Sequence, residues 1–311
     1  MPERVAPREA FGKTLVKLGE KNPDIVVLDA DLAPSTKITY FKERFPERFI
    51  PVGIAEQNMI GIAAGLSTLG LIPFAVTFAC FASRRVCDQV MISVAYPKLN
   101  VKIVGAYVGL FVGKNGATHQ SLEDIAIMRS IANMVVVEPV DALETEKVVK
   151  FACEYDGPVY LRIGRDPMPQ IVPQDYEFQL GKALVLKEGK DVSLISSGAM
   201  VEDTLKAASL IEKEGIRAQV INMSSLKPVD EELIVRVAEE TGRIVTVENH
   251  NIIGGLGSAI AEVVSEKFPV KLKRIGVRDV FGKSGTNEEM KEKFGLRAED
   301  IAKEVLSFLE S

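Results

Sequence analysis

Several residue types are scarce in this sequence, and their scarcity excludes whole classes of protein. The 311 residues include no tryptophan, two histidines and three cysteines. An odd number of cysteines without a Cys-x-x-Cys pair argues against a disulfide framework. Cys80, Cys87 and Cys153 lie in or beside apolar stretches. We therefore expect reduced core cysteines in a cytoplasmic protein, with no metal held by this chain.

Long apolar runs and blocks of basic residues are missing as well. No stretch reaches the ~18 uninterrupted apolar residues that a membrane span needs. The amino terminus, MPERVAPREAFG, lacks the apolar core of a secretion signal. The 43 acidic and 38 basic residues are scattered and give a net charge of −5. Without a basic cluster to neutralise phosphates, the sequence predicts a protein that binds neither nucleic acid nor a membrane.

The sequence does contain a repeated alternation of short β-branched runs and amphipathic stretches. Continuously apolar strands that are separated by helices predict a mostly parallel sheet with helices on both faces. The first set of such strands is IVVLDA, LIPFAVTF, VKIVGAY, MVVVEP and PVYLRIG, and the second is DVSLIS, AQVINM, RIVTVEN and KLKRIGV.

A proline-rich segment, RDPMPQIVPQDYEFQLG, separates the two sets and shows neither a helical nor an alternating pattern. We interpret it as a linker that crosses the surface. The sequence thus predicts an α/β protein of two domains, residues 1–165 and 186–311, joined by a linker over residues 166–185.

The stretch GIAEQNMIGIAAGLSTLG places a carboxylate, Glu56, at the start of a predicted helix that ends at Gly70. A glutamate in a first turn is by default a surface residue stabilised by the helix dipole. Here Ile54, Ala55 and Met59 are apolar neighbours, so a buried carboxylate with a partner is the alternative.

A second stretch, TFACFASRRVCDQV, spaces Phe78, Phe81 and Arg84 three residues apart. On a helical turn these side chains project to one side, and core packing is the default interpretation. An aromatic slot with a polar rim is also typical of a site for a flat heterocycle.

A third stretch, GAYVGLFVGKNGATHQSLED, is a glycine-rich loop that contains His119. A lone histidine is more often structural than catalytic, but glycines let a loop approach a ligand closely. Arg8 and Arg165 are surface residues by default. Arg165 follows PVYLRIG, and residues just past the carboxyl end of a parallel strand are where ligands bind.

Four of these motifs together resemble the transketolase family, specifically its pyrimidine-binding and C-terminal domains. They are ADLAPS (residues 30–35), GIAEQNM (53–59), TFACF (77–81) and GATHQSLED (116–124), in the order and spacing of the family. The resemblance extends from Arg8 to the end of the chain. It implies thiamine diphosphate as the cofactor and the transfer of a two-carbon ketol unit from a ketose phosphate to an aldose phosphate.

The resemblance also implies roles for individual residues at the cofactor. Glu56 would bond a pyrimidine nitrogen and favour the imino tautomer, while carbanion stabilisation belongs to the cofactor. Phe81 would stack on the pyrimidine, with Phe78 as its apolar neighbour. Arg84 and Asp31 are assigned to the same cofactor pocket.

For the sugar, the resemblance places Arg8, Ser35 and Arg165 at the phosphates, which guanidinium groups bind two oxygens at a time. His119 would bond oxygens near the reacting carbonyl and is, with Glu56, a predicted catalytic residue. Asn115 stands where many members carry an Asp that contacts a donor hydroxyl, and Tyr107 where many carry a His. These two departures leave the donor sugar open.

The chain lacks the family's Gly-Asp-Gly followed some 25 residues later by Asn, which holds magnesium and the diphosphate. We therefore expect a separate amino-terminal subunit that holds the magnesium, and a heterotetramer formed by self-association about a two-fold axis. The initial Met just before the pyrimidine-binding domain also favours a separately encoded partner.

Other interpretations remain open at this point. A deoxyxylulose-phosphate synthase fragment and the beta subunit of a 2-oxo acid dehydrogenase would share both domains, and a non-catalytic relative would share the fold. In the second domain GGLGSAI (254–260) is a weak signal for nucleotide binding, and tight helix packing is the favoured interpretation. The sequence reveals no partner for His250. Pentose phosphate metabolism and a specialised sugar route are both compatible with the motifs.

Overall fold

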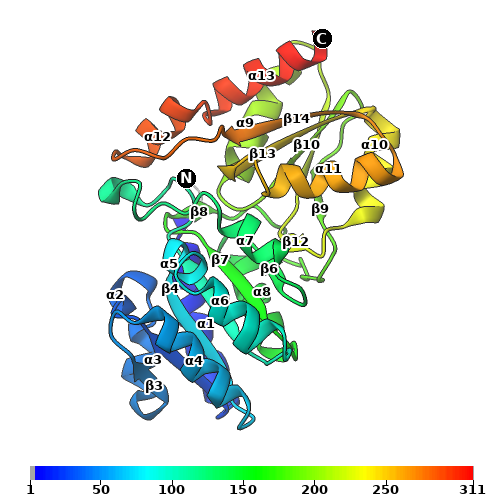
Figure 1. Cartoon of the computed structure of the whole chain (residues 1–311). Coiled ribbons are helices and arrows are strands. Elements are labelled where there is room, and N and C mark those ends of the chain that lie inside the picture. Colours follow the sequence, from blue (N-terminus) through cyan, green and yellow to red (C-terminus); the bar gives the residue numbers. More distant parts are fainter. Residues whose placement is uncertain (1–3, 311) are drawn as a thin grey trace. The chain divides into compact units, whose positions relative to one another are not determined.

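The computed structural model describes residues 4–310, which form two compact units (Figure 1). The first takes in the described residues up to Val108 together with Ile127–Phe178. The second takes in Gly109–Ala126 and the described residues from Gln179 onward. Each unit is an α/β layer structure, so the predicted fold class is confirmed. Within the described residues, no helix has the length and apolar content to cross a membrane.

The sheet of the first unit is parallel, with the strand order β6-β7-β5-β4-β2-β3. Its central strands are buried along nearly their whole length, which explains their largely apolar sequences. The strands are β2 (Ile25–Asp29), β3 (Phe49–Pro51), β4 (Ile72–Phe78), β5 (Lys102–Ala106), β6 (Val135–Val137) and β7 (Val159–Ile163).

Helices pack on this sheet in two groups. Helix α1 (Pro7–Lys21) packs against α3 (Thr39–Arg44) and α8 (Ala142–Glu154). Helix α4 (Glu56–Ser67) packs against β4 and against the π-helix η2 (Val90–Ala95). The shorter helices are α2 (Ala33–Thr36), η1 (Pro46–Arg48), α5 (Ala79–Ser83), α6 (Cys87–Gln89) and α7 (Asp124–Ser130).

Part of the segment interpreted as a linker is tied into the first unit. Strand β8 (Met168–Pro169) pairs with β1 (Arg4–Val5), an element that the sequence did not indicate. Asp141 caps α8 by accepting from the Glu144 amide, and its other oxygen accepts from the amides of Ile171 and Val172. The predicted domain boundaries stay a prediction, but the start of the linker is held by these bonds.

The second unit has the strand order β14-β13-β10-β11-β9, in which only the edge strand β9 runs antiparallel. Helices α9 and α13 pack together, as do α10 and α11 (Figure 1). The strands of this sheet are β9 (Leu184–Lys187), β10 (Val192–Ser196), β11 (Ala218–Asn222), β13 (Arg243–Asn251) and β14 (Lys271–Val277), and the short strand β12 (Ser225–Lys227) lies outside it. The helices are α9 (Met200–Glu212), α10 (Glu231–Thr241), α11 (Leu256–Lys267), α12 (Asn287–Phe294) and α13 (Ala298–Glu310).

The glycine-rich segment Gly109–Ala126 belongs to the second unit by its contacts, although it lies between strands of the first unit in the sequence. Its Leu110, Phe111 and Leu122 are buried in the core of the second unit. Burying three large apolar side chains there fixes the segment to this unit, because each contributes about 1.5–3 kcal/mol of burial.

Candidate functional site

Most of the predicted site residues of the first unit lie at or just after the carboxyl ends of its strands, and Arg8 lies instead in the first turn of α1. Asp31 and Ser35 follow β2, Glu56 follows β3, and Arg165 follows β7. Phe78 ends β4, and Phe81 and Arg84 follow it. Because these strands are parallel, their carboxyl ends share one edge of the sheet, which is where ligands bind in α/β proteins.

Glu56 is a buried carboxylate with a cationic partner. It is the first residue of α4 and only 3% exposed. Its Oε1 accepts a hydrogen bond from Nη1 of Arg85 at 2.8 Å. The guanidinium of Arg85 also lies over the ring of Phe81, 4.0 Å from its centroid. Glu56, Arg85 and Phe81 therefore form one cluster in which the buried charge is paired.

Arg85 is a residue that the sequence analysis missed. The three-residue spacing pointed to Arg84, which is the C-cap residue of helix α5. Nε of Arg84 instead lies 3.5 Å from the Cys80 carbonyl. The sequence signal for Arg85 was its place in an Arg-Arg pair, together with the expectation that Glu56, if buried, needs a cationic partner. Arg84 stays a predicted cofactor contact.

Three aromatic rings stand in a row beside this cluster. Phe78 lies between Phe81 and Tyr107, with ring centroids 6.1 Å and 4.2 Å away and interplanar angles of 23° and 29°. Phe78 is buried, whereas Phe81 is half-buried. Phe81 is thus the most exposed of the three rings and the one that a flat ligand could reach.

Tyr107 connects this row to the predicted phosphate residues. Nη1 of Arg8 donates to the Tyr107 hydroxyl at 2.7 Å and to the Ser35 backbone carbonyl at 2.8 Å. The guanidinium carbons of Arg8 and Arg165 each lie 5.3 Å from the centroid of the Tyr107 ring. The fold therefore brings Arg8, Ser35 and Arg165 together around Tyr107.

Asp31 is exposed in the turn after β2, where it has the left-handed value φ = 64°. Its neighbour Asp29 is buried, and the carboxylate of Asp29 accepts from the Leu32 amide at 2.9 Å. Burial raises the pKa of Asp29, although the amides of Leu32 and Ala33 act in the opposite direction. The turn that presents Asp31 is thus held by a buried carboxyl group that the sequence analysis did not single out.

Asn115 and His119 belong to the second unit, in a loop that is closed at its base. The Ser121 amide donates to the Gly109 carbonyl, and the Leu110 amide donates to Oδ1 of Asn249 at 2.8 Å. Asn115 is exposed, and Nδ1 of His119 lies 2.9 Å from Oγ1 of Thr118. Asn249 was not anticipated, since nothing in the sequence pairs it with residues 139 positions away.

The turn GGLGSAI begins α11, and a buried carboxylate fills it. Oε2 and Oε1 of Glu248 accept from the amides of Leu256 and Gly257 at 2.8 Å and 3.0 Å. A phosphate would need these same amides. The structure thus supports the packing interpretation over nucleotide binding.

His250 has partners in the structure that the sequence did not reveal. It is fully buried, with Nδ1 2.6 Å from the Asn251 carbonyl oxygen. The Glu248 and Asp124 carboxylates lie 3.8 Å and 3.9 Å from its two ring nitrogens.

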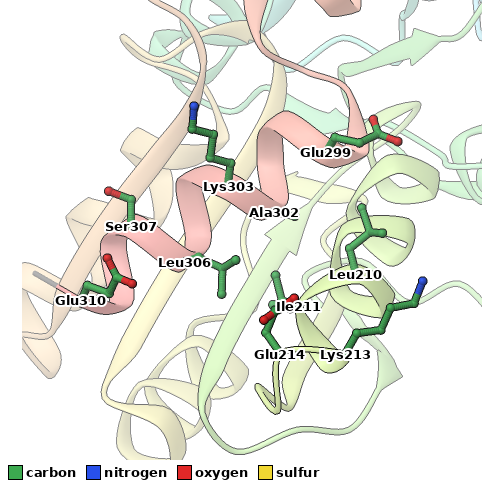
Figure 2. A pocket seen from close by; sticks show the side chains of 10 residues that line it. All are labelled: Leu210, Ile211, Lys213, Glu214, Glu299, Ala302, Lys303, Leu306, Ser307 and Glu310. Carbon is green, nitrogen blue, oxygen red and sulfur yellow. The ribbon is translucent and has the colours of Figure 1, made fainter.

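A surface pocket of about 530 Å³ lies between α9 and α13 (Figure 2). Figure 2 shows charged side chains of both signs at its rim, among them Lys213, Glu214 and Lys303, above an apolar floor that includes Leu306. None of the predicted site residues lines it. In the range 4–310, no three His, Cys, Asp or Glu side chains gather in a way that could hold a metal ion.

Both units match protein families. Residues 3–170 match the pyrimidine-binding domain of transketolase, and residues 181–301 match the transketolase C-terminal domain. A solved structure described as a split-gene transketolase, in an inactive beta4 tetramer, superposes with a TM-score of 0.92. It is 52% identical in sequence, and the alignment covers 98% of this chain and 99% of that one.

Curated relatives of similar length are subunits of transketolases. The 6-deoxy-6-sulfo-D-fructose transketolase subunit SqwH of Clostridium sp. (strain MSTE9) is 48% identical, over 95% of this chain and 92% of its own length. A subunit of the apulose-4-phosphate transketolase of Phocaeicola vulgatus is 42% identical, over 98% of both chains. The 1-deoxy-D-xylulose-5-phosphate synthase of Trichormus variabilis is less similar, at 37%, and this chain spans 48% of it.

Proposed function

Since the chain belongs to the transketolase family, we propose that it is the carboxy-terminal subunit of a thiamine diphosphate-dependent transketolase. In this proposal it transfers a two-carbon ketol unit from a ketose phosphate to an aldose phosphate, together with a separate amino-terminal subunit. The observation that carries the proposal is the cluster of Glu56, Arg85 and Phe81 at the ligand-binding edge of the first sheet.

The residues of this cluster fit the pyrimidine end of thiamine diphosphate. A buried carboxylate beside a half-buried aromatic ring offers a hydrogen-bond acceptor and a stacking face to the same flat ring. Oε1 of Glu56 is bonded to Arg85, so Oε2 is the atom that we propose for the pyrimidine nitrogen. When bound, the cofactor supplies the carbanion stabilisation.

Within this proposal Glu56 holds a proton at the pyrimidine nitrogen and exchanges it during turnover. Arg85 fixes the carboxylate in place. Phe78 supports Phe81 from the buried side of the aromatic row, and Asp31 and Arg84 complete the proposed cofactor contacts. Burial of Glu56 keeps water away from the carboxylate, so its hydrogen bond is stronger than it would be in bulk water.

We propose that Arg8 and Arg165 bind the phosphates of the sugars, with Ser35 beside them. Two guanidinium groups around one tyrosine ring concentrate positive charge at the same sheet edge as Glu56. Guanidinium edges match tetrahedral oxyanions, which supports a phosphorylated substrate. Asn115 and His119, in the loop of the second unit, are proposed to contact oxygens of the sugar. Placement in the pentose phosphate pathway and in the cytoplasm stays a prediction.

An exposed face on α4 and η2 supports the need for a partner subunit. Gly61 and Gly65 lie on the exposed side of α4, and a Cβ atom added to either would meet no atom of this chain. Large apolar side chains are exposed in the same region, including Ile54 at 74%, Leu69 at 77% and Ile92 at 57%. Contiguous exposed apolar surface is typical of interaction sites.

The occupant that we propose for this face is the amino-terminal subunit. The face continues from the first turn of α4, where Glu56 would hold one end of the cofactor. The partner would bring the magnesium and hold the diphosphate end. Self-association of such pairs into a heterotetramer is part of the same proposal.

The first test is ketol transfer from xylulose 5-phosphate to ribose 5-phosphate with thiamine diphosphate and magnesium, by this chain alone and mixed with the amino-terminal subunit. Activity only in the mixture is expected. In the mixture, Glu56→Gln lowers turnover by at least ~100-fold, the usual range for a lost acid-base group, while cofactor binding survives in part. Normal turnover in this variant would refute the proposal. Glu146→Gln, at an exposed carboxylate paired with Lys17, is the control and leaves turnover unchanged.

A further inference from the structure

Tyr107 holds an unusual backbone conformation at the sheet edge. It follows β5 directly and has φ = 60°, a value that residues with a side chain rarely adopt. Its ring is buried and stacked on Phe78. Backbone outliers of this kind cluster at functional sites, where the surrounding structure holds them.

The hydroxyl of Tyr107 helps to fix the position of the Arg8 guanidinium. Nη1 of Arg8 carries two hydrogens, and its two acceptors are the Tyr107 hydroxyl and the Ser35 carbonyl. Nε of Arg8 is buried and has no hydrogen-bond partner among residues 4–310. Tyr107 and Ser35 together therefore fix the guanidinium by one nitrogen, and no group of the described chain accepts a hydrogen bond from its Nε.

Arg165 shows the same arrangement on the same ring. Its Nη1 is paired with Asp166 at 3.0 Å, and its Nε is likewise buried without a hydrogen-bond partner in the described chain. Buried N–H groups without a partner are rare in proteins, and each one calls for an explanation. The Nε edge of arginine binds two oxygens of a tetrahedral oxyanion at once, so a role in binding phosphate explains both.

We propose that Tyr107 is a positioning residue for the anionic end of the substrate. Its hydroxyl holds Arg8 so that the Nε edge faces a terminal phosphate, and its ring sets the separation of Arg8 from Arg165. A histidine here, as in many family members, can donate to a phosphate itself. The Tyr107 hydroxyl accepts from Arg8, and in this proposal it acts through the arginine. This inference rests on the proposed function and extends it to the way in which phosphorylated and unphosphorylated sugars are distinguished.

The experiment uses Tyr107→Phe in the mixture of both subunits, because phenylalanine keeps the ring and removes only the acceptor of Arg8. A hydrogen bond to a charged group is worth about 1.5 kcal/mol or more, which is about tenfold in affinity. We expect KM for xylulose 5-phosphate to rise about tenfold, with kcat unchanged. KM for unphosphorylated xylulose stays the same. Equal changes for both donors, or no change for either, would overturn the assignment.

Two controls separate positioning from folding. Tyr40→Phe removes a hydroxyl that donates to Glu9 at 2.6 Å and leaves the ratio of the two KM values unchanged. The lysine in Arg8→Lys keeps the positive charge but has no Nε edge. We therefore expect KM for xylulose 5-phosphate to be the same in the double variant, Arg8→Lys with Tyr107→Phe, as in Arg8→Lys alone. Additive losses in the double variant would show that Tyr107 does not act through Arg8.

A binding measurement distinguishes failure of this inference from failure of the proposed function. The affinity of the unmixed chain for inorganic phosphate, measured by calorimetry, falls in Tyr107→Phe and not in Tyr40→Phe. A wild-type mixture that transfers no ketol unit would count against the proposed function. Unchanged phosphate affinity in Tyr107→Phe would count against the role of Tyr107.

Discussion

Helix α4 in the first unit contains Gly61 and Gly65, and helix α11 in the second contains Gly257 and is preceded by its N-cap Gly255. Inside a helix, alanine is the better helix former. At α11 the chain itself fills the space beside the glycines. A Cβ atom on Gly255 would lie 1.9 Å from Oε2 of Glu248, and one on Gly257 would lie 2.6 Å from Oγ1 of Thr246. In α4 a Cβ atom on Gly61 or Gly65 would meet open space. The glycines of α11 are thus required by packing within the chain, and those of α4 are not.

The difference between the two helices indicates which surface of the molecule contacts another chain in our proposal. A glycine inside a helix destabilises a protein by roughly 0.5–1 kcal/mol relative to alanine. The space beside Gly255 holds the Glu248 carboxylate that caps α11, which explains that glycine. No such contact explains Gly61 and Gly65 within residues 4–310, so close approach by another chain is the explanation that we propose. Substitutions in the two helices test this contrast.

Gly255→Ala has the largest expected effect. The added methyl group would displace the Glu248 carboxylate from the amides of Leu256 and Gly257 and leave buried polar groups unpaired. We expect a loss of about 2–4 kcal/mol in the free energy of unfolding, measured by urea denaturation of the chain alone. Ser209→Ala, at an exposed position of α9, is the control. A loss of less than ~0.5 kcal/mol would mean that the turn relaxes easily and that its glycine is not required.

Glu248→Gln tests the same cap with a smaller change. An uncharged amide has one oxygen for two amide donors, so one of the hydrogen bonds to Leu256 and Gly257 is lost. The expected loss in the free energy of unfolding is about 1–2 kcal/mol. Hydrogen exchange at the Leu256 and Gly257 amides becomes faster. Unchanged exchange at both amides would show that the carboxylate charge is not needed for the cap.

Gly61→Ala has the smallest expected effect on the stability of the chain, and it raises the stability where the two previous substitutions lower it. Alanine is a better helix former and meets no atom here, so the free energy of unfolding of the chain alone rises by about 0.5–1 kcal/mol. Association with the amino-terminal subunit weakens, as measured by sedimentation of the mixture. Ser209→Ala, which raises helix propensity away from α4, leaves association intact. Wild-type association of Gly61→Ala would show that no chain approaches α4 closely at this position.

The strands and long helices could be predicted from the sequence because their signals are local. Each long buried strand is a largely apolar run, and the helix predicted to start at Glu56 appears in the structure as α4 (Glu56–Ser67). The short elements β1, β8 and β9 were not indicated. Two of them have two residues each, too few for a period to show, and pairing with a distant segment forms them. Arg85 was missed for a similar reason, because its pairing with Glu56, 29 positions away, has no local sequence signal.

The sequence by itself determined that this protein is built from two α/β units, since continuous apolar strands need helices on both faces. Its four motifs indicated the transketolase family. The sequence also determined which residues are candidates for the chemistry. Only the tertiary structure decided their partners, because Glu56 and Arg85 are 29 residues apart and Arg8 and Tyr107 are 99 apart. It also decided that Gly109–Ala126 packs into the second unit, because buried side chains follow the available core and not the order of the chain.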